Sequence, residues 1–391
     1  MFVKILYTLF IFACLYDPAN KILGIKLPLF VVIFLITVVL NKKAIFPSSV
    51  LKYVVLFALV LPISSVLWGY LTNFSSYREA TIIDIIKPYL FVFLSFSLIN
   101  SPKTDINKIF SYCLVVLAST IIVIYTLYVS GIVPIEFFYS FGHESGLYTL
   151  GGRSYGEMEI DRVYFHTSPM LIFGSFYFLD RYFNSKKKQC LFFSLFISTA
   201  MLFSGTRNDM IMAFMPYLTY GYIKSSKTIR LIILVIACCF IVYLVQSGIV
   251  AALFDVTETS NAGKLGYVPV YLKFFSDPVT FFLGDGLGSY AYFPPDGYLN
   301  NTELTYFELI RRFGIFGALV YLVLMYGPVF KLYSVKKNRW LAFALLMYLI
   351  MVFTNPFFFS SNGMMILSIV IFTIYSSSSR NIKHATPIYE Y

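Results

Sequence analysis

Long apolar runs recur along almost the whole of this 391-residue chain and are separated by short polar stretches. About 20 apolar residues in a helix cross the roughly 30 Å of hydrocarbon in a bilayer. Hydrophobic residues make up 59% of the sequence and charged residues only 13%, which excludes an ordinary soluble domain. The runs predict twelve membrane-spanning helices, at about residues 2–16, 23–40, 50–70, 82–100, 109–131, 164–180, 190–204, 209–223, 231–253, 313–332, 340–355 and 362–376.

We therefore expect an all-α, polytopic membrane protein that forms a single integral membrane domain over residues 1–391. The first run leads into Asp17-Pro18 without a small-residue cleavage pattern, which indicates a retained anchor rather than a signal peptide. Two connections are long, at 132–163 and 254–312. Because so little of the chain lies outside the membrane, we expect its polar chemistry in these two loops.

The basic residues indicate an orientation, since Lys and Arg accumulate in the cytoplasmic loops of bacterial inner-membrane proteins. Most of the 30 Lys and Arg residues fall in short connections on the side of the first residue. Both termini are thus expected in the cytoplasm and both long loops in the periplasm. The net charge of +11 follows from this topology, so it gives no support to a nucleic-acid partner.

The sequence contains no signal for a cofactor. It has no Gly-rich nucleotide-binding loop of the Walker type, and its five cysteines lack the spacing of metal ligands. We interpret the cysteines as buried small hydrophobes, and we predict neither a metal nor an organic cofactor. They are Cys14, Cys113, Cys190, Cys238 and Cys239.

A polar break, Ser204–Asp209, separates two apolar runs and places Arg207 at the rim of the membrane. An Arg at the bilayer centre costs on the order of 3 kcal/mol, so one kept near a span needs an anionic partner. Two structural alternatives are a side chain that snorkels to the interface and a pair with Asp209.

Chemistry outside the cell membrane has no nucleotide donors, so a transferase there needs a lipid-borne donor that has already crossed. Such donors carry a diphosphate, which suits the planar, always-charged fork of Arg. Five arginines lie in or beside the long loops and the polar break: Arg153, Arg162, Arg207, Arg311 and Arg312.

Four stretches of the sequence resemble motifs of a known family. Ser204-Gly205-Thr206-Arg207, between two apolar runs, is similar to the Ser-x-x-Arg turn between hairpin helices in the O-antigen polymerase (Wzy) and O-antigen ligase superfamily. The segment 283–290, Asn300-Asn301 and the segment 308–317 are similar to its Gly-rich segment, its Asn-bearing turn and its terminal helix start. The segment 151–156 is similar to its Arg-x-x-Gly stretch.

The resemblance implies a fold like that of the lipid-linked-sugar (GT-C-like) glycosyltransferases. It also implies metal-independent transfer of undecaprenyl-diphosphate-linked glycans at the periplasmic face, in the biosynthesis of lipopolysaccharide or another surface polysaccharide. Ligases of the superfamily place a His near the Asn turn, whereas residues 298–305 contain none, which favours a polymerase. A ligase remains an alternative, and so does a polysaccharide transporter or flippase, although the expected pair of related halves is missing.

For a polymerase, the expected partners are the undecaprenyl-diphosphate-linked oligosaccharide and membrane lipid. A chain-length regulator is a further candidate partner. Arg207, with Arg153 or Arg162, is expected to hold the donor diphosphate. His166, His143 and Glu308 are alternative bases for the acceptor hydroxyl. The residues expected to contact substrate are Arg311, Arg312, Asp285, Tyr164 and His143.

Several charged residues also have a purely structural interpretation. Thr305 and Glu308 have the spacing of a helix capping box, and Glu308 is also placed to pair with Arg312 one helical turn later. Asp285 lies between glycines, where it can serve a turn. Asp84 and Lys87 are predicted to pair with each other within their own span.

Overall fold

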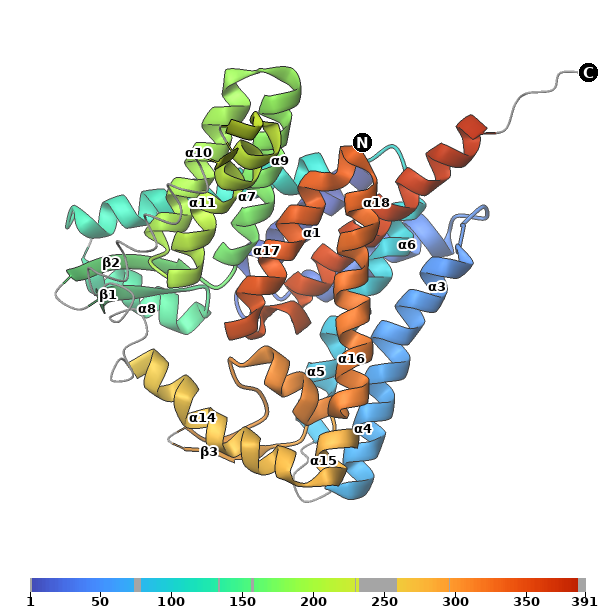
Figure 1. Ribbon diagram of the computed structural model, residues 1–391, viewed down its shortest axis with the longest axis vertical. Helices are drawn as coiled ribbons and strands as arrows, with labels where there is room; N and C mark the ends of the chain where they lie inside the picture. The colour runs from blue at the N-terminus through green and yellow to red at the C-terminus, as the bar shows by residue number, and fades with distance from the viewer. Residues whose placement is uncertain are drawn as a thin grey trace, which may run out of the picture.

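The computed structural model describes residues 2–73, 79–132, 134–155, 158–228, 230–231, 259–294 and 296–385. In this part of the chain helices dominate, and strands are confined to two antiparallel two-stranded hairpins (Figure 1). The expected helical membrane protein is confirmed at this level. Apart from residue 231, the predicted span at 231–253 lies outside the described residues.

The described elements in the first third of the chain are all helices. A π-helical turn, Leu35–Val39, extends α2, and another, Leu56–Val60, joins α3 to α4 without a break. The helices are α1 (Phe2–Tyr16), α2 (Lys26–Phe34), α3 (Ser48–Val55), α4 (Leu61–Thr72), α5 (Glu79–Leu90), α6 (Leu94–Ile99) and α7 (Ile106–Val129).

The middle third contains the first hairpin. Helix α8 and the hairpin fill most of the predicted long loop 132–163, which is therefore folded. Tyr164 was expected inside a span, but it lies in the second strand, and the following α-helix begins only at Leu171. The elements are α8 (Ile135–Ser145), β1 (Tyr148–Tyr155), β2 (Met158–Phe165), α9 (Leu171–Ser185), α10 (Lys188–Phe203) and α11 (Arg207–Lys224).

The last third contains the second hairpin and the longest helix. The described part of the second long loop is also folded, into two helices and the hairpin that precede α16. The elements are α14 (Thr259–Ser276), α15 (Pro278–Leu283), β3 (Ala291–Phe293), β4 (Gly297–Leu299), α16 (Thr305–Ser334), α17 (Arg339–Met351) and α18 (Ser361–Ala385).

Five helices in the described residues are long and apolar enough to cross a membrane: Ser48–Thr72, Ile82–Ile99, Ile106–Val129, Thr305–Ser334 and Ser361–Ser379. Shorter apolar helices occupy three more of the predicted spans, at Phe2–Tyr16, Lys26–Val39 and Lys188–Phe203. Helices α9, α11 and α17 lie at the positions of three others. The predicted spans in the described part of the chain thus overlap with helices, and five of these helices have the length and composition of a membrane span.

Two cores hold the helices together. The large one joins α1, α7, α9, α10, α16, α17 and α18, and α9 packs against α7, α10 and α17. A small second core lies where α14 packs on β3, around Tyr271 and Phe293. It forms a separate cap beside the α15 and α16 end of the large core (Figure 1).

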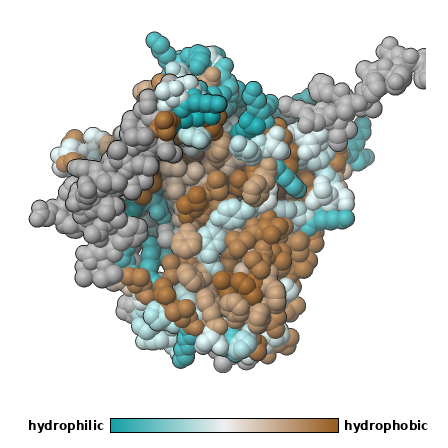
Figure 2. All heavy atoms as spheres, in the orientation of Figure 1, coloured by the Kyte–Doolittle hydropathy of each residue, from teal (hydrophilic) through white to brown (hydrophobic). Residues whose placement is uncertain are grey.

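The outer surface of the helices is largely apolar. Val116 and Val123 on α7, and Val323 and Phe330 on α16, are all exposed. Figure 2 shows apolar surface across the middle of the visible face and hydrophilic residues gathered toward its upper and lower ends. Such a band is expected of a protein that contacts lipid around its middle.

Helix α16 is broken near its beginning. Gly314 has φ 65° and ψ 174°, which leaves a short helical segment, 305–313, before the long straight one. A side chain at Gly314 would lie 2.1 Å from the carbonyl oxygen of Phe282, so only glycine allows the two backbones to meet. The break sets the short segment, with its charged residues, outside the span predicted at 313–332.

Candidate functional site

The turn between α10 and α11 is tightly built. Gly205 adopts a left-handed conformation with φ 61°. Thr206 caps α11, because its Oγ1 accepts a hydrogen bond from the backbone N–H of Asp209 at 3.2 Å. Arg207 is therefore the first residue of α11, directly after the turn.

A buried carboxylate fixes this turn to the beginning of the preceding helical hairpin. Oδ2 of Asp209 accepts hydrogen bonds from the hydroxyls of Ser168 at 2.6 Å and Ser204 at 2.8 Å. Hydrogen bonds to an ionised acceptor are short and strong. They tie the turn to the segment that follows β2, so the position of Arg207 is set by three parts of the chain.

Two of the predicted arginines belong to this turn and its surroundings. Nη1 of Arg207 donates a hydrogen bond to Oδ1 of Asn261 on α14, at 2.7 Å. Arg162, on β2, packs directly on the turn, since a Cβ built on Gly205 would lie 2.4 Å from the Cβ of Arg162. Gly205 thus allows the strand and the turn to approach each other closely. Arg162 therefore lies beside the two residues, Gly205 and Thr206, that precede Arg207.

Tyr164, on the same strand, and His166, directly after the end of the strand, extend the site. Successive side chains of a strand point to opposite faces, so Arg162 and Tyr164 share one face of β2. The rings of Tyr164 and His166 are 5.5 Å apart in an edge-to-face arrangement. Burial raises the pKa of Tyr164 well above its usual value, and the charges of Asp209 and Glu303 raise it further.

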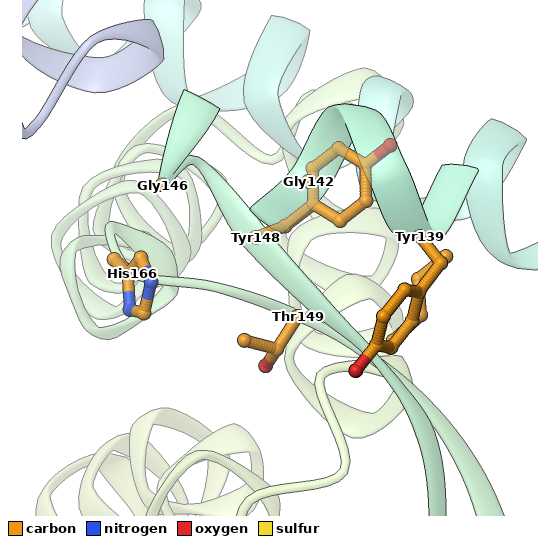
Figure 3. Close-up of a pocket in the computed structure, with 7 residues that line it drawn as sticks. Tyr139, Gly142, Gly146, Tyr148, Thr149 and His166 are labelled. Carbon is orange, nitrogen blue, oxygen red and sulfur yellow. The ribbon is translucent and has the colours of Figure 1, made fainter. Parts of the chain in front are cut away.

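A cavity of about 260 Å³ opens between α8 and the hairpin. Figure 3 shows His166 on one side of it, Tyr139 on the other and Thr149 between them. Burial lowers the pKa of His166, so its imidazole is neutral at physiological pH and can accept a proton. The cavity therefore places a neutral base among tyrosines that suit contact with sugar rings.

Helix α14 joins this region to a second polar cluster. Asn261, Lys264, Tyr267 and Tyr271 follow one another at helical spacing and all make polar contacts. Asn261 meets Arg207, and Nζ of Lys264 lies 3.0 Å from Oε2 of Glu303. Tyr267 binds Asp296, and Tyr271 reaches the second cluster.

The second cluster surrounds Glu308, which is buried. Its Oε1 accepts a hydrogen bond from the Tyr271 hydroxyl at 2.6 Å, and its Oε2 lies 2.9 Å from Nη2 of Arg311 and 2.8 Å from Nε of Arg312. The predicted pair of Glu308 and Arg312 is thus present. The prediction of a capping box is wrong. Leu304 is the N-cap residue, and the Thr305 hydroxyl donates its hydrogen bond to the carbonyl of Asn355.

Arg311 is completely buried, and the remaining donors of its guanidinium are also satisfied. Its Nη1 donates to Oγ of Ser289 at 2.8 Å, and its Nη2 donates to the carbonyl of Asn300 at 3.1 Å. Arg312, nearly as buried, donates to the same carbonyl. These contacts bind together the Gly-rich segment and the Asn turn, so this cluster is a structural anchor for the loop.

The Gly-rich segment packs backbone to backbone on the break in α16. A Cβ on Gly284 would lie 2.5 Å from the backbone nitrogen of Gly314. The backbone N–H of Asp285 donates to the carbonyl of Arg311 at 2.6 Å. Burial raises the pKa of Asp285, and its Oδ1 accepts a hydrogen bond from the Thr280 hydroxyl at 3.1 Å. Asp285 therefore serves this turn.

The predicted site residues thus form two groups linked by α14. Arg162, Tyr164, His166 and Arg207 form the first, while Glu308, Arg311, Arg312 and Asp285 form the second. Arg153 pairs through its backbone with Ile160 in the hairpin, and His143 lies on α8, but both side chains lie outside the described part of the chain.

Sequence reasoning missed the polar contacts of α14 and the part that Ser168 plays in holding Asp209. Gly263, Gly266 and Pro269 are typical of a loop, so the sequence does not readily predict α14. The three- and four-residue spacing of the polar residues from Asn261 to Tyr271 is nevertheless a helical signal. Across the described ranges, no group of three or more His, Cys, Asp or Glu side chains is arranged to hold a metal.

Comparison with known proteins gives no relative. No protein-family model, no curated protein and no solved structure matches the chain.

Proposed function

We propose that the protein is a membrane glycosyltransferase that polymerises surface polysaccharide, working as an O-antigen polymerase on undecaprenyl-diphosphate-linked repeat units. The observation that carries the proposal is the packing of Arg162 on Gly205, two residues before Arg207. Two arginines from different segments, one at a helix N-terminus, suit a diphosphate, because both guanidinium forks and the helix dipole favour bound anions.

In this proposal the donor glycan is carried on undecaprenyl diphosphate, which lies against Arg162 and Arg207. A hydroxyl at the non-reducing end of a newly arrived lipid-linked repeat unit attacks the anomeric carbon of the donor. The bond from that carbon to the diphosphate oxygen breaks, and negative charge develops on the leaving group. Fixed guanidinium groups stabilise such charge without reorganising during the reaction.

The acceptor occupies the cavity beside the hairpin. His166 takes the proton of the attacking hydroxyl, because its lowered pKa keeps it neutral and it lines the cavity. Tyr164 lies between His166 and Arg162 along the strand, and it would contact the sugar at the reacting bond. Of the alternative bases, Glu308 is fully engaged by Tyr271, Arg311 and Arg312, which favours His166.

The test is the ladder of surface polysaccharide on a gel, from a strain that lacks the gene and carries a plasmid copy. Wild type, Arg207→Ala, Arg207→Lys and Arg162→Ala are compared at matched expression. Arg181→Lys is the control, because Arg181 is exposed and stacks on Tyr177 away from this site. We expect a full ladder from wild type and the control, and a single capped repeat unit from the other three.

Two results would overturn the proposal. If the deletion strain lacks even the single repeat unit, the protein acts in ligation or export. If Arg207→Ala keeps a full ladder, the turn does not hold the donor.

A further inference from the structure

A second cavity, of about 380 Å³, lies at the end of α11, whereas Arg207 of the site proposed above lies at its beginning. It opens where α9 and α11 end and where α17 begins, at the end of the molecule that carries the α9–α10 connection (Figure 1). Its volume falls within the roughly 300–1,000 Å³ that small-molecule sites occupy.

Four basic side chains line this cavity: Lys224, Lys336, Lys337 and Arg339. They come from two different segments, the end of α11 and the connection between α16 and α17, and all four residues are exposed at the rim. Arg339 is held in place, because its Nε donates to the carbonyl of Tyr333 at 3.1 Å and its guanidinium lies over the Tyr333 ring. A fixed arginine is better prepared for an anion than a free one.

One carboxylate, Asp180, also lines the cavity, but it is occupied. Its Oδ1 accepts a hydrogen bond from the Tyr220 hydroxyl at 2.7 Å, and its Oδ2 accepts one from Nδ2 of Asn184 at 2.9 Å. Asp180 therefore ties α9 to α11 at the floor of the cavity. The four cations outnumber it, so the cavity attracts anions.

The rest of the wall is apolar and continues onto the side of the helices. Phe343 and Ile223 line the cavity. Leu218 and Tyr222 are exposed on α11, which ends at the cavity, and Phe330 is exposed on α16, which ends just before Lys336. An anionic headgroup beside an exposed apolar surface is the chemistry of a phospholipid that stands at the membrane boundary.

We propose that this basic cavity binds the headgroup of an anionic phospholipid, with the lipid's acyl chains along α11 and α16. The phosphate meets Lys224, Lys336, Lys337 and Arg339, and Phe343 contacts the glycerol. The orientation expected from the basic loops places this site in the cytoplasmic leaflet. The inference is independent of the proposed polymerase activity.

The test measures lipid binding to the purified full chain in neutral detergent by native mass spectrometry. Phosphatidylglycerol is compared with phosphatidylcholine of the same acyl chains. The variant is Lys336→Gln/Lys337→Gln, and the matched control is Lys42→Gln/Lys43→Gln, which removes two exposed lysines from another short connection. The melting temperature of each variant serves to check that it folds. Lys224→Gln provides a second variant on a separate segment.

We expect wild type and the control to prefer phosphatidylglycerol, and the cavity variant to lose roughly thirtyfold in affinity, since each cation near an anionic lipid adds about 1 kcal/mol. Lys224→Gln should lose part of that affinity. Equal binding of both lipids would overturn the proposal, and so would equal losses in the variant and the control. If inorganic phosphate raises the melting temperature as much as phosphatidylglycerol does, the site binds a free anion and not a lipid.

Discussion

Arg207 and Asn261 are 54 residues apart in the sequence and are joined by a hydrogen bond of 2.7 Å from Nη1 to Oδ1. The contact connects the turn before α11 to the beginning of α14. Asn261 accepts through a neutral amide oxygen, so this contact directs the guanidinium without neutralising its positive charge. A carboxylate at the same place would direct the guanidinium equally well but would neutralise its charge.

This difference predicts an order of effects at position 261. Asn261→Ala removes a positioning contact, and we expect polymer formation to fall by about tenfold, as for the loss of one hydrogen bond to a charged group. Asn261→Asp should reduce it further, because the new carboxylate pairs with Arg207 and repels a diphosphate.

Polysaccharide ladder intensity at matched expression measures both variants. Lys273→Ala is the control, because Lys273 is exposed near the other end of α14. Activity of Asn261→Asp at or above that of Asn261→Ala would contradict an electrostatic role for Arg207.

The break in α16 gives a prediction about stability. Gly314→Ala forces a positive φ on alanine and a 2.1 Å approach of its Cβ to the Phe282 carbonyl. We expect a loss of about 2 kcal/mol or more in the free energy of unfolding. Gly327→Ala on the same helix is the control, because nothing lies within 4 Å of its Cβ position and alanine favours a helix.

Thermal unfolding of the purified chain in one detergent compares the two variants. A melting temperature for Gly314→Ala at or above that of Gly327→Ala would show that the backbone contact contributes nothing.

Much of the helical architecture could be predicted from the sequence. Apolar runs must satisfy their backbone groups internally, so their positions give the helices directly. The predicted pair of Asp84 and Lys87 is also present, with 2.8 Å between Oδ1 and Nζ, because three residues of helix fix its geometry. The folded loops were not predicted, since their hairpins and α14 depend on contacts between distant segments such as Tyr271 and Phe293.

The candidate site, like the fold, could be predicted from the sequence only in part. Sequence alone singled out Arg162 and Arg207 as cations near the membrane, but their proximity depends on Gly205 packing on β2. The sequence also predicted the pair of Glu308 and Arg312, but it assigned Arg311 and Arg312 to contact with substrate. Their burial around Glu308 follows from the break at Gly314, which no local pattern reveals.

Burial of the Glu308 cluster predicts a large cost for breaking it. Glu308→Gln leaves the guanidinium of Arg311, which has no exposed surface, without its counter-ion. Breaking a buried pair by removing one partner costs about 3–5 kcal/mol. Asp84→Asn is the control, because that pair is largely exposed and such pairs contribute at most about 1 kcal/mol.

Chemical or thermal unfolding of the full chain in detergent measures both changes. Equal losses in the two variants would mean that the Glu308 cluster is no more important to stability than a surface pair.

The lowered pKa of His166 predicts how activity depends on pH. Burial disfavours the charged imidazolium, so His166 keeps its neutral, proton-accepting form below its ordinary pKa of about 6.5. Polymerisation by wild type should therefore persist as the pH falls to about 6.5 and decline only below that value. His166→Gln should be much slower, by about a hundredfold or more, and should lack this acidic decline.

The same shift acts on stability. The unfolded chain binds a proton at His166 more readily than the folded chain does, so this contribution to stability is complete above a pH of about 6.5 and is lost as the pH falls toward the lower folded pKa. Initial rates with purified lipid-linked repeat units across this range, beside the melting temperature at each pH, separate the two effects. A decline of the rate already above pH 6.5, or the same acidic decline in His166→Gln, would assign the proton transfer to another group.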